Sequence, residues 1–335
     1  MIGVVISGTG DVSNKHYKAI TSTTHGKLLG VCSRDAKRAE EAAKKWHTKA
    51  YGFDEMLKDP EVDLVVICSS DDEHYRQSIK ALEAGKNVIV EKPPALNLRE
   101  LVHMVKLSKD KKVQLFPVHN YIFRPRILQV KQMLDKGEIG EVTYAFFSLI
   151  QRMPEERAKR YHGAFLTQAY HQIYLSNFLL GLPEEITAMS SIITYKEVKM
   201  EELAVSMFKY KNGAVANIVI NWCLNDLSTH SWLWLEKILG TKGVITVSAL
   251  DDYSYHEDIP YLAAIVLGYP YSFINYQKHV IDDVLAEKKK PLISAYDAVI
   301  VLDMIDKLKN CANKGKVIKY KPPSLEELIK QYKLG

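Results

Sequence analysis

The feature that most constrains this chain is an alternation, from Met1 to about Val118, of short apolar runs with segments whose apolar residues recur at helical spacing. The apolar runs predict strands at residues 3–7, 27–32, 64–68, 87–90 and 113–117. The intervening segments predict helices at residues 36–46, 73–84 and 98–109. Strands that alternate with crossover helices form a parallel sheet. We therefore expect an α/β fold that begins with a Rossmann domain over residues 1–120.

The pattern changes after residue 120. A predicted helix at 125–136 is followed by stretches of alternating apolar and polar residues, at 141–150, 185–194, 203–210, 214–222 and 230–238. Such alternation predicts antiparallel strands, and the dipeptide Asn212-Gly213 favours a tight hairpin between two of them. A helix at 297–312 and a strand-like run at 316–320 follow. We expect residues 121–335 to form an α+β domain with a large, mostly antiparallel open sheet, whose C-terminal segment could return to the first domain.

Composition limits the class of function. Of the 335 residues, 47% are hydrophobic, which is enough for two domain cores. Lys and Arg exceed Asp and Glu by only five, without a basic tail, so the charge does not favour a nucleic-acid partner. No apolar run approaches the roughly 18 residues of a membrane span, and the N-terminus begins a strand rather than a signal peptide. The spacing of Cys32, Cys68, Cys223 and Cys311 indicates neither a metal site nor disulfides, so we expect a cytoplasmic protein.

A glycine-rich loop follows the first predicted strand. It reads Gly8-Thr9-Gly10-Asp11-Val12-Ser13, and a helix is expected to begin near Asn14. In dinucleotide-binding proteins the first glycine permits a tight turn, the second lets the backbone approach the pyrophosphate, and a small third residue permits close packing. Amides at the helix N-terminus then bind the phosphates. Glycine in such turns often only relieves strain, but its place in the first strand–helix unit favours a dinucleotide site.

The end of the second predicted strand bears on the choice of cofactor. NAD-preferring proteins typically carry an acidic residue there that bonds the ribose 2′-hydroxyl, whereas this chain has Ser33 and Arg34. These two residues could hold a 2′-phosphate, because the guanidinium fork matches phosphate geometry. A solvated arginine that opens the next helix is the alternative. We therefore expect NADP to be preferred over NAD.

The fourth predicted strand ends in Glu91-Lys92-Pro93-Pro94. The carboxyl ends of parallel strands border the ligand crevice, so Lys92 is expected beside the nicotinamide and the substrate. There Lys92 either exchanges a proton with a substrate oxygen, helped by a lowered pKa, or stays charged and polarises that oxygen. A surface pair of Lys92 with Glu91 is the structural alternative.

These segments resemble the Gfo/Idh/MocA oxidoreductase family, named for glucose–fructose oxidoreductase and inositol dehydrogenase. The resemblance runs through residues 8–13, 63–70, 81–93, 138–142 and 162–181, and 82–93 is its most specific part. It implies an NAD(P)-dependent enzyme that acts on sugars, sugar derivatives or polyols, and a homodimer or homotetramer formed through the open sheet. By the resemblance, further residues that border the cofactor are Ser69, Ser70, Asp71, His74, Glu91 and Asn120, with a structural role as the alternative for His74. Arg124 could line the substrate crevice or be a surface charge at a helix start.

The family's second catalytic element is an Asp four residues before a His. Here Thr167 stands in place of the aspartate and is followed by His171 at the matching position. A spacing of four places both side chains on one helix face, so we expect His171 to transfer the proton and Thr167 to contact substrate. Three explanations for the missing acid stay open: Lys92 with His171 suffices, Glu155 or Glu156 substitutes, or catalysis has been lost.

The main hypothesis is a reversible hydride transfer between the nicotinamide and a carbinol carbon, with Lys92 and His171 handling the hydroxyl proton. The competing class is a non-catalytic NAD(P)-binding regulator of the same fold, which Thr167 makes credible. A reductase of a non-sugar carbonyl or unsaturated bond is the third possibility.

Overall fold

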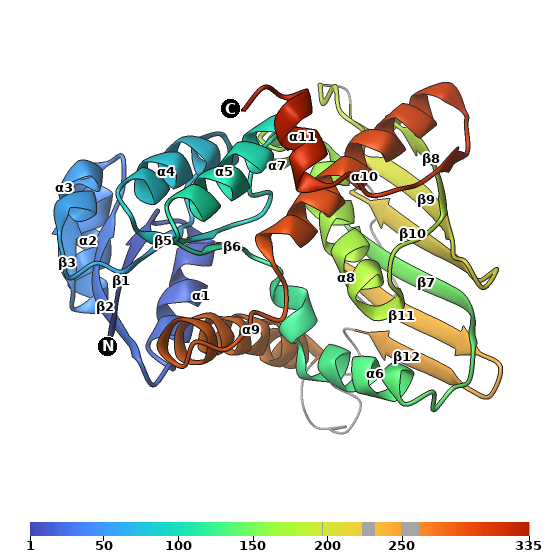
Figure 1. Cartoon of the computed structure of the whole chain (residues 1–335), viewed down its shortest axis with the longest axis horizontal. Coiled ribbons are helices and arrows are strands. Elements are labelled where there is room, and N and C mark those ends of the chain that lie inside the picture. Colours follow the sequence, from blue (N-terminus) through green and yellow to red (C-terminus); the bar gives the residue numbers. More distant parts are fainter. Residues whose placement is uncertain (196, 223–231, 249–260, 335) are drawn as a thin grey trace. The chain divides into compact units, whose positions relative to one another are not determined.

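The computed structural model describes residues 1–195, 197–222, 232–248 and 261–334 (Figure 1). It divides into two compact units, each discontinuous in sequence. The first unit holds Met1–Phe123, Pro270–Val299 and Pro323–Gly335, and the second holds Arg124–Tyr269 and Ile300–Pro322. The chain therefore returns to the first unit twice. The sequence predicts the ranges 1–120 and 121–335, with a C-terminal segment that could pack on the first domain.

The first unit is built on a six-stranded parallel sheet in the order β3-β2-β1-β4-β5-β6. The strands are β1 (Ile2–Ser7), β2 (Gly26–Cys32), β3 (Lys49–Tyr51), β4 (Leu64–Ile67), β5 (Asn87–Val90) and β6 (Leu115–Pro117). β1, β4 and β5 are almost wholly buried, because helices cover both faces of such a sheet. The strand order reverses between β1 and β4, and ligands of open α/β sheets bind outside the carboxyl ends of the strands at such a switch point. The predicted Rossmann fold is confirmed.

Crossover helices join these strands, namely α1 (Asp11–Ile20), α2 (Ala36–Trp46), α3 (Phe53–Lys58), α4 (Asp71–Glu83) and α5 (Leu98–Asp110). The predicted start of α1 near Asn14 is wrong. The helix begins three residues earlier because Gly10 takes the extended N-cap conformation and its carbonyl accepts a hydrogen bond from the amide of Ser13 at 3.1 Å. α2 begins where predicted, since the Asp35 side chain caps its first amides.

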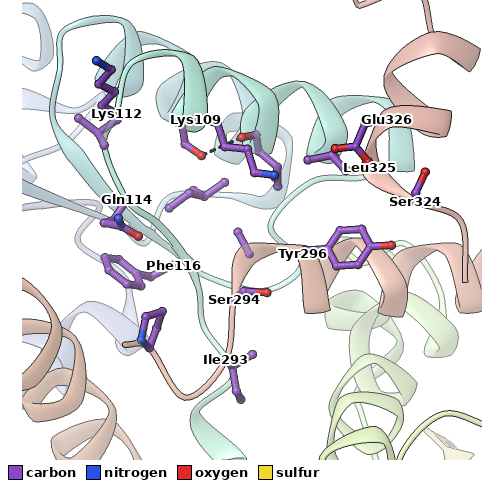
Figure 2. A pocket seen from close by; sticks show the side chains of 16 residues that line it. Lys109, Lys112, Gln114, Phe116, Ile293, Ser294, Tyr296, Ser324, Leu325 and Glu326 are labelled. Carbon is purple, nitrogen blue, oxygen red and sulfur yellow. Dashed lines mark hydrogen bonds between the residues drawn. The ribbon is translucent and has the colours of Figure 1, made fainter. Parts of the chain in front are cut away.

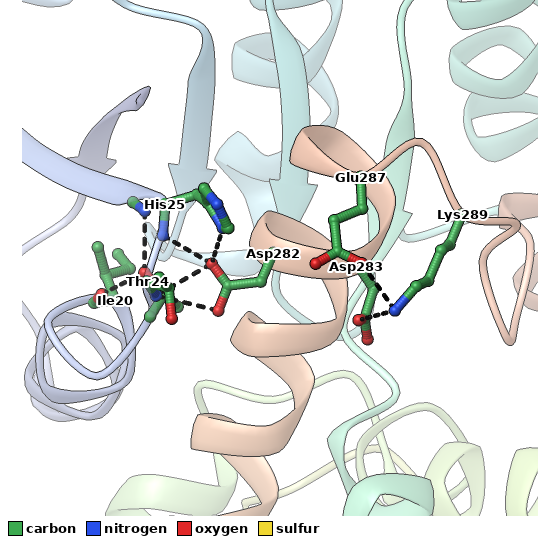
Figure 3. Close-up of polar contacts among 9 residues, drawn as sticks. Ile20, Thr24, His25, Asp282, Asp283, Glu287 and Lys289 are labelled. Carbon is green, nitrogen blue, oxygen red and sulfur yellow. Dashed lines mark hydrogen bonds and ion pairs between the residues drawn. The ribbon is translucent and has the colours of Figure 1, made fainter.

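A distant segment completes the first unit. It contains the end of α9 (Tyr261–Lys278) and the π-helix η3 (His279–Ala286), neither of which the sequence pattern predicts. Figure 3 shows how η3 is anchored: the carboxylate of Asp282 accepts hydrogen bonds from the backbone amides of Thr24 and His25, at 2.7–3.0 Å. Tyr276 of α9 donates from its hydroxyl to the carbonyls of Phe116 and Pro117. The turn before β2 and the end of β6 are thereby tied to residues far away in sequence.

The second unit contains a seven-stranded sheet in the order β12-β11-β7-β10-β9-β8-β13. The strands are β7 (Val142–Gln151), β8 (Glu185–Ser191), β9 (Leu203–Lys209), β10 (Val215–Asn221), β11 (Trp232–Gly240), β12 (Val244–Ser248) and β13 (Ile318–Lys319). All neighbours pair antiparallel except β7 and β10, so the mostly antiparallel sheet is confirmed, although the sequence pattern does not indicate the parallel pair. The hairpin at Asn212-Gly213 also forms. Residues 230 and 231 of the predicted strand 230–238 lie outside the described residues.

Helices pack on one face of this sheet. The helical elements of this unit are α6 (Pro125–Asp135), α7 (Glu155–Ala158), the π-helix η2 (Phe165–Ala169), α8 (Tyr170–Leu180) and most of α10 (Ala295–Lys314), whereas η1 (Asn120–Phe123) and α11 (Leu325–Gln331) belong to the first unit. α8 packs on β7 (Figure 1). The Cys311 thiol of α10 lies 3.9 Å from the carbonyl oxygen of Ile186 in β8. Buried and accessible residues alternate along β9 and β10, so the opposite face of the sheet carries the accessible set.

Candidate functional site

Gly8 ends β1 at the switch point of the parallel sheet. Its φ is +122°, and a Cβ there would lie 2.4 Å from the carbonyl oxygen of Cys68. Its amide donates to the carbonyl of Cys32 at 2.8 Å, which keeps β1 paired with β2 up to the turn. No L-residue with a side chain fits this backbone, so the first glycine is needed for the turn itself.

Gly10 differs from Gly8, because its φ of −80° suits any residue and a Cβ there would meet no atom within 4 Å. Glycine at this position therefore leaves open space in front of the first turn of α1. The first amides of a helix lack acceptors within the helix and carry its partial positive charge. The loop from Gly8 to Val12 thus fits a bound pyrophosphate, with Ser13 buried behind it.

Two arginines lie beyond β2. Arg34 is exposed beside the partly exposed Ser33. The side chain of the next residue, Asp35, caps α2 and accepts hydrogen bonds from the amides of Lys37 and Arg38. The Arg38 guanidinium donates to the carbonyl of Thr9 in the glycine loop at 3.3 Å. Sequence reasoning missed Arg38, although it lies one helical turn after Arg34.

The loop after β4 carries Ser69, Ser70 and Asp71, which lead into the first turn of α4. The Ser69 hydroxyl donates to the side-chain oxygen of Gln77 at 3.2 Å. His74 is 1% exposed, with Nδ1 at 2.7 Å from the carbonyl oxygen of Pro93 and Nε2 at 3.2 Å from that of Ser69. The contacts of His74 therefore run to the protein backbone.

Glu91 at the end of β5 is buried rather than on the surface. One carboxylate oxygen lies 2.9 Å from Nε2 of His16, and the other accepts a hydrogen bond from the amide of Lys92 at 3.0 Å. Burial acts to raise the pKa of Glu91, but the hydrogen bond and charge of His16, together with Lys92, lower it. An ionised carboxylate therefore holds the backbone of Lys92, whose side chain is partly exposed.

Two buried polar residues follow β6. Asn120 donates from its side-chain amide to the hydroxyl of Ser272 at 2.9 Å. His119 is 1% exposed, and burial lowers its pKa to about 3, so its imidazole is neutral at physiological pH. Sequence reasoning passed over His119, although it lies two residues after β6. The carboxyl ends of the parallel strands thus gather all the predicted cofactor residues at one edge of the sheet.

Thr167 and His171 lie in the second unit. Thr167 is in the π-helix η2 and His171 in the first turn of α8, and both are buried. Nδ1 of His171 lies 2.9 Å from the hydroxyl of Tyr174, whose ring packs edge-on against the imidazole. A phenol therefore contacts this imidazole, where a carboxylate was the expected orienting group. π-Helical turns occur frequently at functional sites.

The two acids considered as substitutes make surface contacts. Glu155 accepts a hydrogen bond from the amide of Glu197 at 2.8 Å. Glu156 pairs with Lys159 at 2.7 Å, and its side chain is 82% exposed. Neither of these contacts involves His171.

Arg124 stands at the N-cap position of α6, where its side chain makes no capping hydrogen bond, and is 1% exposed. Its guanidinium carbon lies 3.7 Å from the centre of the Trp234 ring, and Nη1 lies 3.5 Å from a carboxylate oxygen of Glu236. Burial raises the pKa of Glu236 to about 7, and the charge of Arg124 opposes this shift. Arg124 is therefore a buried, stacked cation and not the exposed charge that was the alternative.

A cavity of about 680 Å³ lies elsewhere on the first unit, along α5, β6, residues 291–296 and the start of α11 (Figure 2). Lys109, Lys112 and Tyr296 line it together with apolar side chains, and none of the predicted site residues does. Within the described ranges no group of His, Cys, Asp and Glu could hold a metal ion. No described helix is both long and apolar enough to span a membrane.

The fold and the loop geometry define the class as an NAD-binding oxidoreductase. The model described as "Oxidoreductase family, NAD-binding Rossmann fold" matches residues 2–119, and the "GFO/IDH/MocA C-terminal domain" matches residues 127–246. The two matches together cover most of the chain. The chain belongs to the Gfo/Idh/MocA oxidoreductase family.

Similar proteins match over nearly the full length. Myo-inositol 2-dehydrogenase of Thermotoga maritima is 26% identical over an alignment of 345 positions that covers 98% of this chain and 99% of the relative. Trans-1,2-dihydrobenzene-1,2-diol dehydrogenase of Mus musculus is 24% identical over an alignment of 329 positions that covers 92% of this chain and 95% of the relative. The crystal structure of the WlbA dehydrogenase from Bordetella pertussis, in complex with NADH and UDP-GlcNAcA, has a TM-score of 0.83 at 22% identity and covers 96% of this chain and 98% of that one. This last likeness shows the fold.

Proposed function

We propose that this protein transfers a hydride between a nicotinamide dinucleotide and the carbinol or carbonyl carbon of a sugar, sugar derivative or polyol. One observation carries the proposal: the glycine loop after β1 and Lys92 after β5 end at the same edge of the parallel sheet, with Lys92 fixed by the buried Glu91. The names of the relatives, an inositol dehydrogenase and a diol dehydrogenase, support an alcohol carbon as the reacting centre.

The protein's part in the reaction is to bind, to orient and to move a proton. The bound dinucleotide supplies or accepts the hydride at C4 of its nicotinamide. Lys92 and His171 handle the hydroxyl proton, with Thr167 and Arg124 as further substrate contacts. Tyr174 orients His171 through the 2.9 Å contact between its hydroxyl and Nδ1 of the imidazole.

We also propose that NADP is preferred, although the matched family description and the WlbA complex name NAD and NADH. The support is the pair of guanidinium groups beyond β2, one exposed at Arg34 and one at Arg38 in contact with the glycine loop. Arg34→Ala should weaken NADPH binding much more than NADH binding in fluorescence titrations. Lys37→Ala, at an exposed position in the same turn, is the matched control. Equal losses for the two cofactors in Arg34→Ala would contradict the assignment.

A cofactor-binding regulator without turnover is the second candidate function. The observation that favours it is the hydroxyl of Thr167 at the position of the family's acid, with a phenol instead of a carboxylate on His171. A panel of sugars, polyols and aromatic diols, assayed by the absorbance of the reduced nicotinamide, separates the two. Turnover of any sugar or polyol supports the enzyme. Turnover of aromatic diols alone would indicate a non-sugar substrate, and tight NADH binding without turnover would indicate the regulator.

We further propose a homodimer or homotetramer that forms through the open face of the second sheet. Met189 of β8 is 78% exposed and Met207 of β9 is 45% exposed. Accessible apolar side chains gathered on one face are typical of a protein–protein contact.

We also propose a cytoplasmic location, because the thiols of Cys32, Cys68 and Cys311 are buried and not joined in disulfides. Cys223 lies outside the described residues.

A further inference from the structure

The two residues that flank Lys92 are each held by a buried histidine. Nε2 of His16 lies 2.9 Å from the carboxylate of Glu91, and Nδ1 of His74 lies 2.7 Å from the carbonyl oxygen of Pro93. His16 is fully buried and His74 is 1% exposed. The histidines come from different helices, α1 and α4, so two helices make hydrogen bonds to the residues on either side of Lys92.

The hydrogen-bond chemistry fixes which nitrogen of each ring faces the turn. Both ring nitrogens of His74 face carbonyl oxygens, which only accept; the contact of Nδ1 with Pro93, at 2.7 Å, is shorter than that of Nε2 with Ser69, at 3.2 Å, so we place the donated proton on Nδ1. A carboxylate with a lowered pKa also only accepts, so Nε2 of His16 donates to Glu91.

The same two helices begin at the loops proposed to bind the dinucleotide. α1 follows the glycine loop, and α4 follows Ser69 to Asp71. The far side of the His16 ring is fixed by Gln277, whose side-chain nitrogen lies 2.8 Å from Nδ1, and by the edge-on ring of Phe273. Each histidine therefore links a cofactor-binding loop to the backbone beside the lysine.

We propose that His16 and His74 are positioning residues for Lys92. They hold the backbone on either side of the lysine in register with the cofactor loops, so that its amine meets the substrate oxygen. The inference rests on the proposed function for the role of Lys92, and it assigns His74 to the lysine turn instead of to the ribose. A lysine side chain is long and flexible, and a misplacement of about 1 Å costs on the order of 100-fold in rate.

Matched amide substitutions separate this role from a merely structural one. The side-chain nitrogen of Asn reproduces Nδ1 of a histidine, and that of Gln reproduces Nε2. H74N and H16Q therefore keep the donor that faces the lysine turn, whereas H74Q and H16N lose it. We expect kcat to fall roughly 10- to 100-fold further in H74Q than in H74N, and likewise further in H16N than in H16Q, with a similar Kd for NADH within each pair.

A second readout needs no substrate. Reductive methylation with isotope-labelled formaldehyde places an NMR probe on Lys92, and the loss of one signal in K92M identifies it. The Lys92 signal should move in H74Q and H16N and stay in place in H74N and H16Q. Equal effects within each pair, or a fall in NADH affinity that matches the fall in kcat, would overturn the proposal.

The result also separates this inference from the proposed function. If K92M keeps full turnover, the proposed function fails. If K92M loses turnover and the Lys92 signal is the same in all four variants, only the positioning role fails. Should H16N not fold, H74Q carries the test, because His74 reaches the turn from the other helix.

Discussion

The buried histidine after β6 gives a prediction whose size follows from its environment. His119 is 1% exposed, and burial lowers its pKa to about 3, whereas a histidine in an unfolded chain has a pKa of about 6.5. Below about pH 6.5 the imidazole of His119 takes up a proton in the unfolded chain but stays neutral in the folded protein. His119 therefore leaves the free energy of unfolding unchanged above about pH 6.5 and lowers it progressively as the pH falls from there toward 3.

The magnitude follows from the separation of the two pKa values. Each pH unit in this window costs about 1.4 kcal/mol of unfolding free energy for one proton. Between about pH 6.5 and pH 5 the loss is therefore about 2 kcal/mol, and at about pH 3 it approaches 5 kcal/mol.

The assay is urea unfolding of the wild type and of His119→Gln at about pH 7.5 and pH 5. The variant removes the titrating group, so the wild type should lose about 2 kcal/mol more than the variant between the two pH values. All other titrating groups cancel in this difference, and so does any uniform loss of stability in the variant. The same pH dependence in both proteins would refute a buried, neutral His119.

Three further predictions concern the glycine loop and the open sheet. Gly8→Ala should lower the unfolding free energy by about 2–4 kcal/mol, because of the positive φ and the clash with Cys68. Gly10→Ala should leave stability unchanged in urea unfolding and yet weaken NADH binding in fluorescence titrations by about tenfold or more, since its methyl group fills the space proposed for the pyrophosphate. Unchanged binding in Gly10→Ala would contradict the phosphate site. Met207→Lys should shift sedimentation toward the monomer, whereas Tyr271→Lys, at an exposed position in the first unit, should not; the same assembly in both would refute the proposed interface.

The parts of this protein that were predictable from sequence depend on local physics. β1, β4 and β5 are short apolar runs, and such runs read as buried parallel strands without knowledge of their neighbours. Gly8 could be identified because a strand-to-helix turn with a positive φ selects glycine. The contact between His171 and Tyr174 is also local, since residues three apart meet on a helix. It was therefore predictable from sequence, although only the replacement of the acid by Thr167 was considered.

The parts that were not predictable depend on contacts between distant segments. Gln277, which fixes His16, lies 261 residues away in sequence, and no spacing signals that pairing. The return of residues 270–299 to the first unit is likewise a matter of tertiary packing, anchored by groups such as Asp282. The start of α1 was misplaced because Gly10 serves as the N-cap, a position where the sequence pattern favours Ser, Thr, Asp or Asn.

The most direct test of the central claim compares wild type with K92M for NADH binding and for turnover on the panel of sugars and polyols. The proposed function predicts that the wild type oxidises at least one polyol or reduces the matching carbonyl compound. It predicts that K92M binds NADH with unchanged affinity and that its turnover is slower than that of the wild type by at least about 100-fold. Wild-type turnover in K92M, or a wild-type protein that binds NADH and reacts with no member of the panel, would contradict the claim.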